Sequence, residues 1–253
     1  MFNSVKESAL RIARSFGYDI VPLREVKERD FALHLRQLFE LLEIDCVLDV
    51  GANAGQYRDF LRHRVRYDGT IVSFESVSRH VEHLKSRSLG DARWHIEGYA
   101  LGREPGRLPV NRTPSDQISY FAEPDSRRRS AFRPLNAPRQ AESVPVRTLD
   151  EALPRLQEIL GYRRPYLKLD THGLDLEVLG GAKATLPTVL ALQTEASIIS
   201  VHEGLPGYMD TIRYLNARGF EITGLYPVSR DESLRLIEFD CVMVNADPAP
   251  RRR

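Results

Sequence analysis

The sequence predicts an α/β protein built on a doubly wound, mostly parallel sheet. Short apolar runs alternate with segments whose apolar residues recur at helical spacing, which is the pattern of strands joined by crossover helices. One of these runs also breaks into a glycine turn that opens a helix, as ligand-binding turns of such sheets do. Seven runs are predicted as strands: 46–50, 70–75, 93–98, 166–170, 189–195, 219–225 and 238–244.

Two helices are expected before the first strand. Apolar residues recur at helical spacing in 3–16 and again in 28–43. These helices could cap a site, pack on the sheet or form a homo-oligomer, and the first is amphipathic enough to touch a membrane surface. We expect packing on the sheet. The chain is therefore divided into a helical extension over 1–43, a main domain over 44–246 and a basic tail over 247–253.

The first strand ends in the turn D-x-G-x-N-x-G, which predicts a nucleotide-cofactor site. Gly51 can adopt backbone angles barred to other residues, and the helix that follows offers unpaired N–H groups. The dinucleotide fingerprint G-x-G-x-x-G is not met, because Arg58 stands where its third glycine would be. A cofactor without phosphates fits better. Glu75 ends the second strand, where a carboxylate can accept hydrogen bonds from both ribose hydroxyls.

Composition and charge exclude several classes of protein. The chain has 36 Lys and Arg against 35 Asp and Glu, a net charge of +1, so no overall field favours nucleic acid. The arginine clusters at 127–129 and 251–253 are interpreted as a solvated loop and tail. Cys46 and Cys241 are expected to be buried free thiols. No apolar run approaches the ~20 residues that span a bilayer and no signal-peptide core is present, so a soluble cytoplasmic protein is expected.

The pattern weakens at about 103–146, where prolines recur and an insertion is expected. Residues 112–140 could form a lid over a site or a mobile surface loop. Tyr120, Phe121 and Phe132 favour the lid, since aromatic side chains in a polar loop can stack on a sugar or another flat apolar surface.

The glycine turn and Glu75 together resemble the class I S-adenosylmethionine-dependent methyltransferases. The later stretch 166–182 begins Tyr-Leu-Lys-Leu-Asp-Thr-His-Gly and continues as an acidic and apolar helix. It looks like the FkbM family, whose members carry a strand ending in Lys-x-Asp, then a glycine and such a helix; residues 144–150 are similar to another block of that family. The resemblance covers roughly 44 to 246. Ser76 replaces a common proline, and Thr171-His172-Gly173 replaces a common Glu-Gly.

This resemblance implies a Rossmann-like fold and S-adenosyl-L-methionine as the cofactor. The positions that match the family's cofactor site begin at the first strand and follow the sheet edge. They are Asp49, Gly51, Asn53 and Gly55 at the methionine end, Gln56 and Tyr57 at the helix start, Glu75 at the ribose, Ser76, Tyr99 and Ala100 at the adenine, and Asp170. The acid that many methyltransferases place after the third strand is missing, and Glu97 is expected to pack rather than replace it.

Methyl transfer asks the protein to align an acceptor oxygen and remove its proton. His172 is the first choice for the base, because an imidazole titrates near neutral pH. Asp170 could orient His172, act as the base itself or stabilise the sulfonium. Glu195 ends the next strand and is a further catalytic candidate. Substrate contacts are expected from His202, Glu203 and Tyr120.

A metal ion is not favoured at this site. Asp170 and Glu195 end neighbouring strands and could hold magnesium against a diol, but carboxylates also hydrogen-bond sugar hydroxyls directly. Asp175 and Glu177 suit the start of a helix. Lys168 is expected to point to the opposite face of the sheet from Asp170 and to be structural.

The predicted function is transfer of a methyl group to a hydroxyl of a sugar, oligosaccharide, glycolipid or related natural product. The arginine-rich and proline-rich composition is consistent with a bacterial source. An NAD-dependent oxidoreductase is an alternative that Arg58 disfavours. A non-catalytic cofactor-binding protein is another, because His172 departs from the common family sequence. Nucleic-acid methylation is disfavoured by the lack of a basic field.

Overall fold

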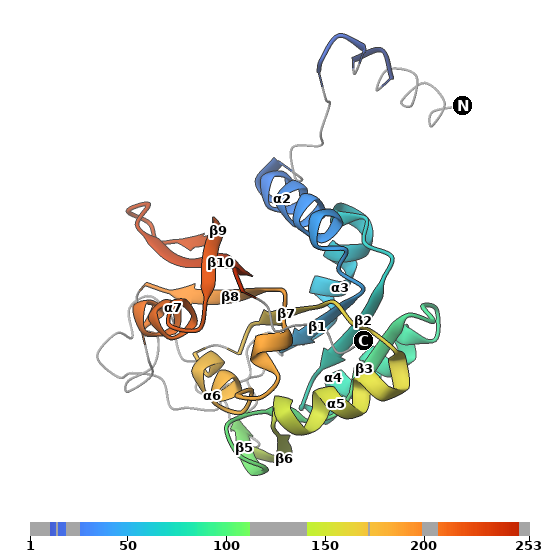
Figure 1. Ribbon diagram of the computed structural model, residues 1–253, viewed down its shortest axis with the longest axis vertical. Coiled ribbons are helices and arrows are strands. Elements are labelled where there is room, and N and C mark those ends of the chain that lie inside the picture. Colours follow the sequence, from blue (N-terminus) through green and yellow to red (C-terminus); the bar gives the residue numbers. More distant parts are fainter. Residues whose placement is uncertain are drawn as a thin grey trace.

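A seven-stranded sheet forms the centre of the molecule (Figure 1), and its strands run in the order β3-β2-β1-β7-β8-β10-β9. The computed structural model describes residues 11–13, 15–18, 26–111, 141–171, 173–198 and 207–247. The strands are β1 (Cys46–Val50), β2 (Thr70–Phe74), β3 (Trp94–Glu97), β7 (Pro165–Leu169), β8 (Ala191–Ser197), β9 (Phe220–Arg230) and β10 (Leu236–Asn245). The first five are parallel, whereas β10 is antiparallel to both of its neighbours. The predicted mostly parallel, doubly wound sheet is confirmed.

Helices cover both faces of this sheet (Figure 1). They are α2 (Val26–Leu42), α3 (Gln56–Phe60), the π-helix η2 (Leu61–Val65), α4 (Ser78–Ser88), α5 (Leu149–Leu160), α6 (Asp175–Gly180), η4 (Leu186–Thr188) and α7 (Tyr208–Asn216). On one face, α2, η2 and α4 pack on strand residues such as Val47 and Tyr166. On the other, α5, α6 and α7 pack on residues such as Leu48 and Leu167. Most of the expected first helix, 3–16, lies outside the described residues.

The block at 144–150 includes the residues that begin α5. Thr148 and Glu151 form a capping box, in which each side chain accepts from the other's backbone N–H. Asp150 accepts from the backbone N–H groups of Ala184 and Thr185 and so ties α5 to the turn after α6. These residues therefore join two helices beside the carboxyl end of the sheet.

A second, three-stranded sheet lies at the edge of the first and has the order β4-β6-β5. Its strands are β4 (Ala100–Leu101), β5 (Gly106–Asn111) and β6 (Ala141–Arg147). The expected insertion at about 103–146 thus begins and ends in paired strands, which the sequence pattern did not indicate. Pro109 lies in the edge strand β5, and Pro145 lies beyond the two residues that pair with the short β4, so both are tolerated. The candidate lid at 112–140 lies outside the described residues.

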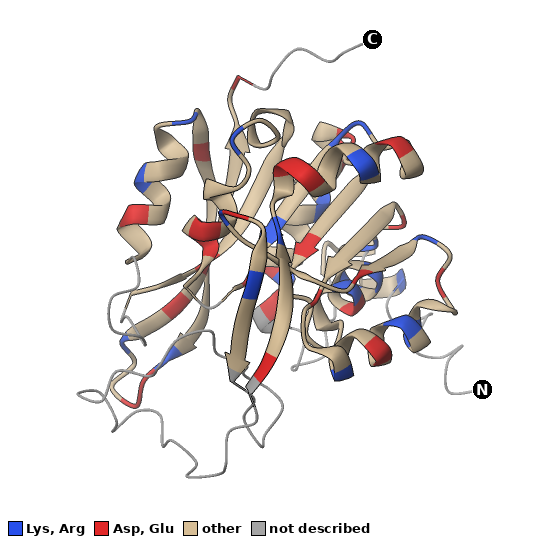
Figure 2. Cartoon of the chain, turned by 90° about the horizontal axis from the view of Figure 1, so that it is seen from below, with Lys and Arg blue, Asp and Glu red and all other residues tan. Residues whose placement is uncertain are grey.

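Acidic and basic residues alternate along the described elements, with no region of a single charge sign (Figure 2). Cys46 and Cys241 are both buried free thiols, as predicted. Within the described part of the chain, no helix has the length and apolar character needed to cross a membrane. The arginine clusters at 127–129 and 251–253 lie outside it.

Candidate functional site

A pocket opens at the carboxyl ends of β1, β2 and β7, beside the second sheet, which is where sheets of this kind bind ligands. It brings together residues from five separate segments of the chain. The predicted cofactor residues that line it are Gly51, Asn53, Glu75, Ser76, Tyr99, Ala100 and Asp170. The sequence therefore located this edge of the sheet from the strand ends alone.

The other predicted cofactor residues lie outside the lining formed by the described residues. Asp49 is fully buried beneath the loop. The Gln56 side chain accepts from the backbone N–H of Ala54 at 3.1 Å. Tyr57 donates its hydroxyl to Gln193 at 2.8 Å, and a Cβ on Gly55 would lie 2.9 Å from the guanidinium of Arg87. Their contacts with a cofactor remain a prediction.

Gly51 brings the loop into contact with the end of β7. Its φ of +82° lies in the left-handed region, and a Cβ there would lie 2.0 Å from the backbone oxygen of Asp170. The backbone N–H groups of Gly51 and Ala52 both donate to the Phe74 carbonyl at 3.1 Å. The glycine is thus needed for packing between strand ends, in addition to any close approach to a ligand.

Glu75 is held in the pocket by backbone amides. One carboxylate oxygen, Oε1, accepts from the N–H groups of Ser76 at 2.8 Å and Val77 at 2.9 Å, and Oε2 accepts from that of Asn53 at 2.8 Å. A carboxylate has about four acceptor positions, so one remains on Oε2. That position can accept a ribose hydroxyl, as the sequence predicted, although a second hydroxyl would have to displace an amide.

Apolar and aromatic side chains form the end of the pocket that the sequence assigns to the adenine. Tyr99 and Ala100 share it with Leu108 and Val110 from β5 and with His80 from the first turn of α4. Burial and the nearby charge of Glu97 raise the pKa of Tyr99 to about 12, so its hydroxyl is neutral at physiological pH. The second sheet therefore supplies part of the pocket wall.

Sequence patterns missed several of these residues. Leu108 and Val110 were overlooked because β5 was not predicted, and His80 carries no motif of its own. Glu97 accepts from Arg155 of α5 at 2.6 Å, so its carboxylate is engaged outside the lining, as expected. The spacing of apolar residues at 108 and 110, two apart as in a strand, is the signal that was available.

Lys168 lies at the centre of the site's charges. Its Nζ is 2.9 Å from Asp49 Oδ1 and 3.3 Å from Asp170 Oδ2, and it donates to the Gly51 carbonyl at 3.3 Å. The expectation that Lys168 faces away from Asp170 is wrong, because residues two apart in a strand share a face of the sheet. Burial alone would lower the pKa of Lys168, but Asp49 and Asp170 raise it well above its usual value.

A row of buried polar side chains extends from this lysine in both directions. On one side Trp94 donates to Ser73, which donates to Asp49 Oδ2, both at 3.0 Å. On the other side the Tyr57 ring lies over the ammonium, with its centroid 5.1 Å from Nζ. The row then continues through Gln193, which donates to Asp240 at 2.9 Å. The row lies on the α2 face of the sheet and crosses it from β3 to β10.

Two carboxyl groups are protonated more readily than usual: that of Asp240, at the end of this row, and that of Asp175, at the start of α6. Burial raises the pKa of Asp240 to about 6, and the charge of Asp170 adds to this effect. Burial also raises the pKa of Asp175, whose oxygens accept from the hydroxyls of Thr171 and Thr194. Asp175 begins α6, and Glu177 pairs with Arg103 at 3.0 Å on the surface. Asp175 thus fixes the turn that follows Asp170.

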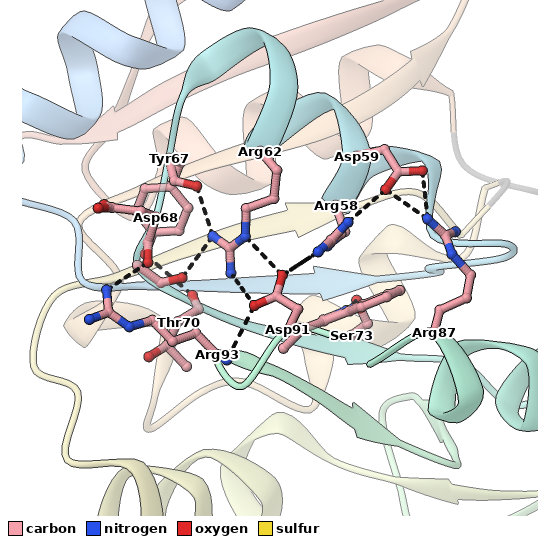
Figure 3. Close-up of polar contacts among 12 residues, drawn as sticks. Arg58, Asp59, Arg62, Tyr67, Asp68, Thr70, Ser73, Arg87, Asp91 and Arg93 are labelled. Atoms are coloured by element: carbon pink, nitrogen blue, oxygen red, sulfur yellow. Dashed lines mark hydrogen bonds and ion pairs between the residues drawn. The ribbon is translucent and has the colours of Figure 1, made fainter. Parts of the chain in front are cut away.

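Three arginines pair with Asp59 and Asp91 in the region that follows the glycine turn (Figure 3). Arg87 of α4 donates to the Ala54 carbonyl at 2.5 Å and to both oxygens of Asp59 at 2.7 Å. Arg58 and Arg62 both contact Asp91, and their hydrogen bonds overcome the effect of burial and lower the pKa of Asp91 to about 2. Arg58, which replaces the third glycine of a dinucleotide fingerprint, is therefore engaged in an ion pair.

The catalytic and substrate candidates are only partly described. His172, His202, Glu203 and Tyr120 lie outside the described residues. Glu195 is half-buried in β8, where it pairs in register with Asp240 of β10, and it is not among the described residues that line the pocket. Among the residues with described positions, no group of three or more His, Cys, Asp or Glu side chains could hold a metal ion.

Comparison with solved structures finds proteins of related fold. A methyltransferase FkbM from Methylobacillus flagellatus KT is 16% identical, with 79% of this chain and 43% of that one covered and a TM-score of 0.48. A SAM-dependent methyltransferase from Aquifex aeolicus is 12% identical, with 88% and 94% covered and a TM-score of 0.40. Fibrillarin from Aeropyrum pernix, solved with natively bound S-adenosyl-L-methionine, is 14% identical, with 84% and 73% covered and a TM-score of 0.43. This chain spans less than half of the M. flagellatus protein.

The family of this chain is assigned from its sequence. No curated protein matches the chain. A family model described as the methyltransferase FkbM domain matches residues 49–222, which is more than half of the chain and includes β1, the glycine turn and the strand that ends at Asp170. The chain therefore belongs to the FkbM family of S-adenosylmethionine-dependent methyltransferases.

Proposed function

We propose that this protein transfers a methyl group from S-adenosylmethionine to a hydroxyl of a sugar, oligosaccharide, glycolipid or related natural product. The observation that carries the proposal is the position of Asp170, whose carboxylate lines the cofactor pocket at the end of β7. An oxygen nucleophile must lose a proton, and a carboxylate at this edge can accept a hydrogen bond from a hydroxyl. An acceptor with several hydroxyls suits such a site.

The chemical character of the pocket residues suits this cofactor. The free acceptor position on Glu75 suits a ribose hydroxyl, and the side chains of Tyr99, Leu108 and Val110 suit the flat adenine ring. Gly51, Asn53 and Asp170 are left for the methionine end. When bound, the cofactor supplies an electrophilic methyl group and its own leaving group.

We assign proton removal to His172, with Asp170 orienting it or replacing it. Glu195, His202, Glu203 and Tyr120 are assigned to the acceptor side. The reaction needs no metal in this proposal, and magnesium held by Asp170 and Glu195 is the alternative that the test below includes. The division at 1–43, 44–246 and 247–253, with an insertion or lid at about 103–146, is part of the same proposal. So are a homo-oligomer formed through the N-terminal helices and a cytoplasmic, reducing location in which Cys46 and Cys241 stay free.

Two alternatives make different predictions. A non-catalytic protein of the same family would bind the cofactor without transferring its methyl group to any hydroxyl. An NAD-dependent oxidoreductase would bind NAD, but the family assignment and the ion pair made by Arg58 both argue against that function.

The first test is calorimetric titration with S-adenosylhomocysteine and with NAD, each with and without magnesium. Binding of S-adenosylhomocysteine alone is expected. Labelled S-adenosylmethionine is then incubated with a panel of unmethylated sugars and oligosaccharides and with amines of similar size. A labelled methyl ether supports the proposal, whereas labelled amines alone would contradict it.

Two variants separate cofactor binding from proton removal. Glu75→Ala removes the ribose acceptor, so binding of S-adenosylhomocysteine is expected to fall by roughly 100-fold or more. His172→Ala is expected to keep that binding and lose methyl transfer by at least about 100-fold. The exposed Glu82 on α4 gives a control, Glu82→Ala, that should change neither measurement. Equal loss of binding in the Glu75 and His172 variants would contradict the role given to His172.

A further inference from the structure

Lys168 is buried against two residues that line the pocket, Gly51 and Asp170, and is itself outside the lining formed by the described residues. Its side chain is 5% exposed, and that of Asp49 is fully buried. An ammonium has three N–H donors, and the three oxygens that surround this one come from Asp49, Gly51 and Asp170. Each of these oxygens belongs to a different part of the site: the end of β1, the glycine turn and the end of β7.

Stability alone does not account for this arrangement. Removing two charges from water costs several kcal/mol per ion, and well-packed apolar side chains of similar size are often as stable or more stable. A buried lysine between two acids is therefore poor evidence of a stabilising role. Its contacts with two residues that line the pocket, Gly51 and Asp170, point instead to a role in ligand binding.

The surroundings of Lys168 restrict its position further. The ring of Tyr57 covers the ammonium, and the Tyr57 hydroxyl is fixed by Gln193. Asp49 is fixed in turn by Ser73. The ammonium is therefore held in place, and it can hold in place the two groups that it contacts in turn. These are the Gly51 carbonyl and the Asp170 carboxylate.

We propose that Lys168 is a positioning residue for the cofactor, which holds Asp170 and the glycine turn at a fixed separation across the methionine end of the pocket. The cluster of Asp49, Lys168 and Asp170 also has one more negative than positive charge, which suits a ligand that carries a positive sulfonium. The inference rests on the cofactor-binding half of the proposed function and is independent of the acceptor.

The test measures affinity for S-adenosylhomocysteine by calorimetry in the full chain. Lys168→Met keeps the length of the side chain and removes its charge, and we expect it to weaken binding by roughly 10-fold or more. Lys168→Arg keeps the charge and is expected to lose less. The control is Lys183→Met, which removes an exposed lysine from the turn after α6 and should bind as the wild type does.

Asp49 provides an independent variant that does not touch the pocket. Asp49→Asn can still accept from Ser73 but no longer pairs with Lys168 as an anion, so a loss of about 3-fold to 10-fold is expected. In the double variant with Lys168→Met, the loss should be close to that of Lys168→Met alone, because Asp49 acts through the lysine. If the loss of affinity in the double variant equalled the product of the two single losses, the two residues would act independently, which would contradict an effect of Asp49 through Lys168.

The integrity of the variants is read from Trp94, which is the chain's one tryptophan and is linked to Asp49 through Ser73. Its fluorescence maximum in the ligand-free variants should match that of the wild type. If Lys168→Met does not fold, Asp49→Asn decides the question by itself.

Wild-type affinity in a folded Lys168→Met or Asp49→Asn variant, with only a lower melting temperature (Tm), would overturn the positioning role. Equal losses in Lys168→Met and Lys168→Arg would overturn the role of the ammonium charge. A wild-type protein that did not bind S-adenosylhomocysteine would instead contradict the cofactor-binding half of the proposed function, and the Lys168 proposal with it.

Discussion

Gly51 lets two strand ends meet, and the site depends on that contact. The residue adopts a left-handed backbone conformation and lies against the Asp170 carbonyl, so it joins the glycine turn to the carboxylate that lines the pocket. A side chain at this position would push the turn away from β7. The residue is thus required for the shape of the pocket before any ligand binds.

Gly51→Ala is expected to lower the free energy of unfolding by roughly 2–4 kcal/mol, because a Cβ is strained at this φ and also clashes with Asp170. Urea unfolding measures the effect. Gly161→Ala is the matched control, since Gly161 has a φ of +72° and open space around its missing Cβ. The loss of unfolding free energy in Gly161→Ala measures the backbone strain alone. Equal losses in both variants would show that the contact with Asp170 does not matter.

Asp240 gives a pH-dependent prediction. Its pKa in the folded protein is about 6, above the ordinary value of 3.8, so the folded state binds its proton more tightly than the unfolded state does. Stability contributed by this group is therefore present at low pH and is lost as the pH rises from about 4 to about 6. Above that range the ionised carboxylate opposes folding.

Asp240→Asn should remove this penalty, since the amide oxygen can still accept from Gln193. We expect the variant to be more stable than the wild type by about 3 kcal/mol near pH 8 and close to it near pH 4. Urea unfolding at several pH values measures the difference. Asp68→Asn, an exposed change before β2, is the control. A stability gain that did not vary with pH would contradict the assignment.

Among the secondary-structure elements, β5 lines the pocket, although its sequence pattern did not predict it. Leu108 is 39% exposed although it is a large apolar side chain, and the exposed portion faces the cofactor pocket. An adenine ring in the pocket would cover it. We therefore expect the second sheet to contribute to ligand affinity through surface that is uncovered in the free protein.

Leu108→Ala is expected to weaken binding of S-adenosylhomocysteine by about 3-fold to 10-fold through lost apolar contact, with little change in Tm. Adenosine alone should show the same loss, because it lacks only the methionine part. Leu225→Ala is a matched control, since Leu225 is 55% exposed on β9 and outside the pocket lining formed by the described residues. An effect on S-adenosylhomocysteine without one on adenosine would place Leu108 away from the adenine.

Considered as a whole, the main sheet was readable from the sequence because its inner strands β1, β2, β7 and β8 are largely buried and appear as apolar runs. The ends of those runs also located Glu75 and Asp170. The second sheet was hidden, since Pro109 and Pro145 interrupt the patterns of β5 and β6 and since β4 has only two residues. Likewise β9 extends to Arg230, beyond the predicted 225, because Pro227 interrupts its pattern.

Side-chain partners were the least predictable part of the site. Nothing in the spacing of Lys-x-Asp reveals that Lys168 also reaches Asp49, because that contact depends on the register of β1 against β7. Asp240 was missed for the same reason, as its partner Gln193 lies in another strand. These contacts follow from the tertiary arrangement of strands that are distant in the sequence.

The contact between Lys168 and the Gly51 carbonyl joins positions that are 117 residues apart. The glycine turn is made early in synthesis, but the other wall of the pocket does not exist until β7 has been inserted beside β1. Parallel pairing of this kind forms late, because the intervening chain must first be ordered. A nascent chain would therefore not capture the cofactor on its glycine turn alone. The cofactor would bind only the completed sheet and, by mass action, protect it from unfolding.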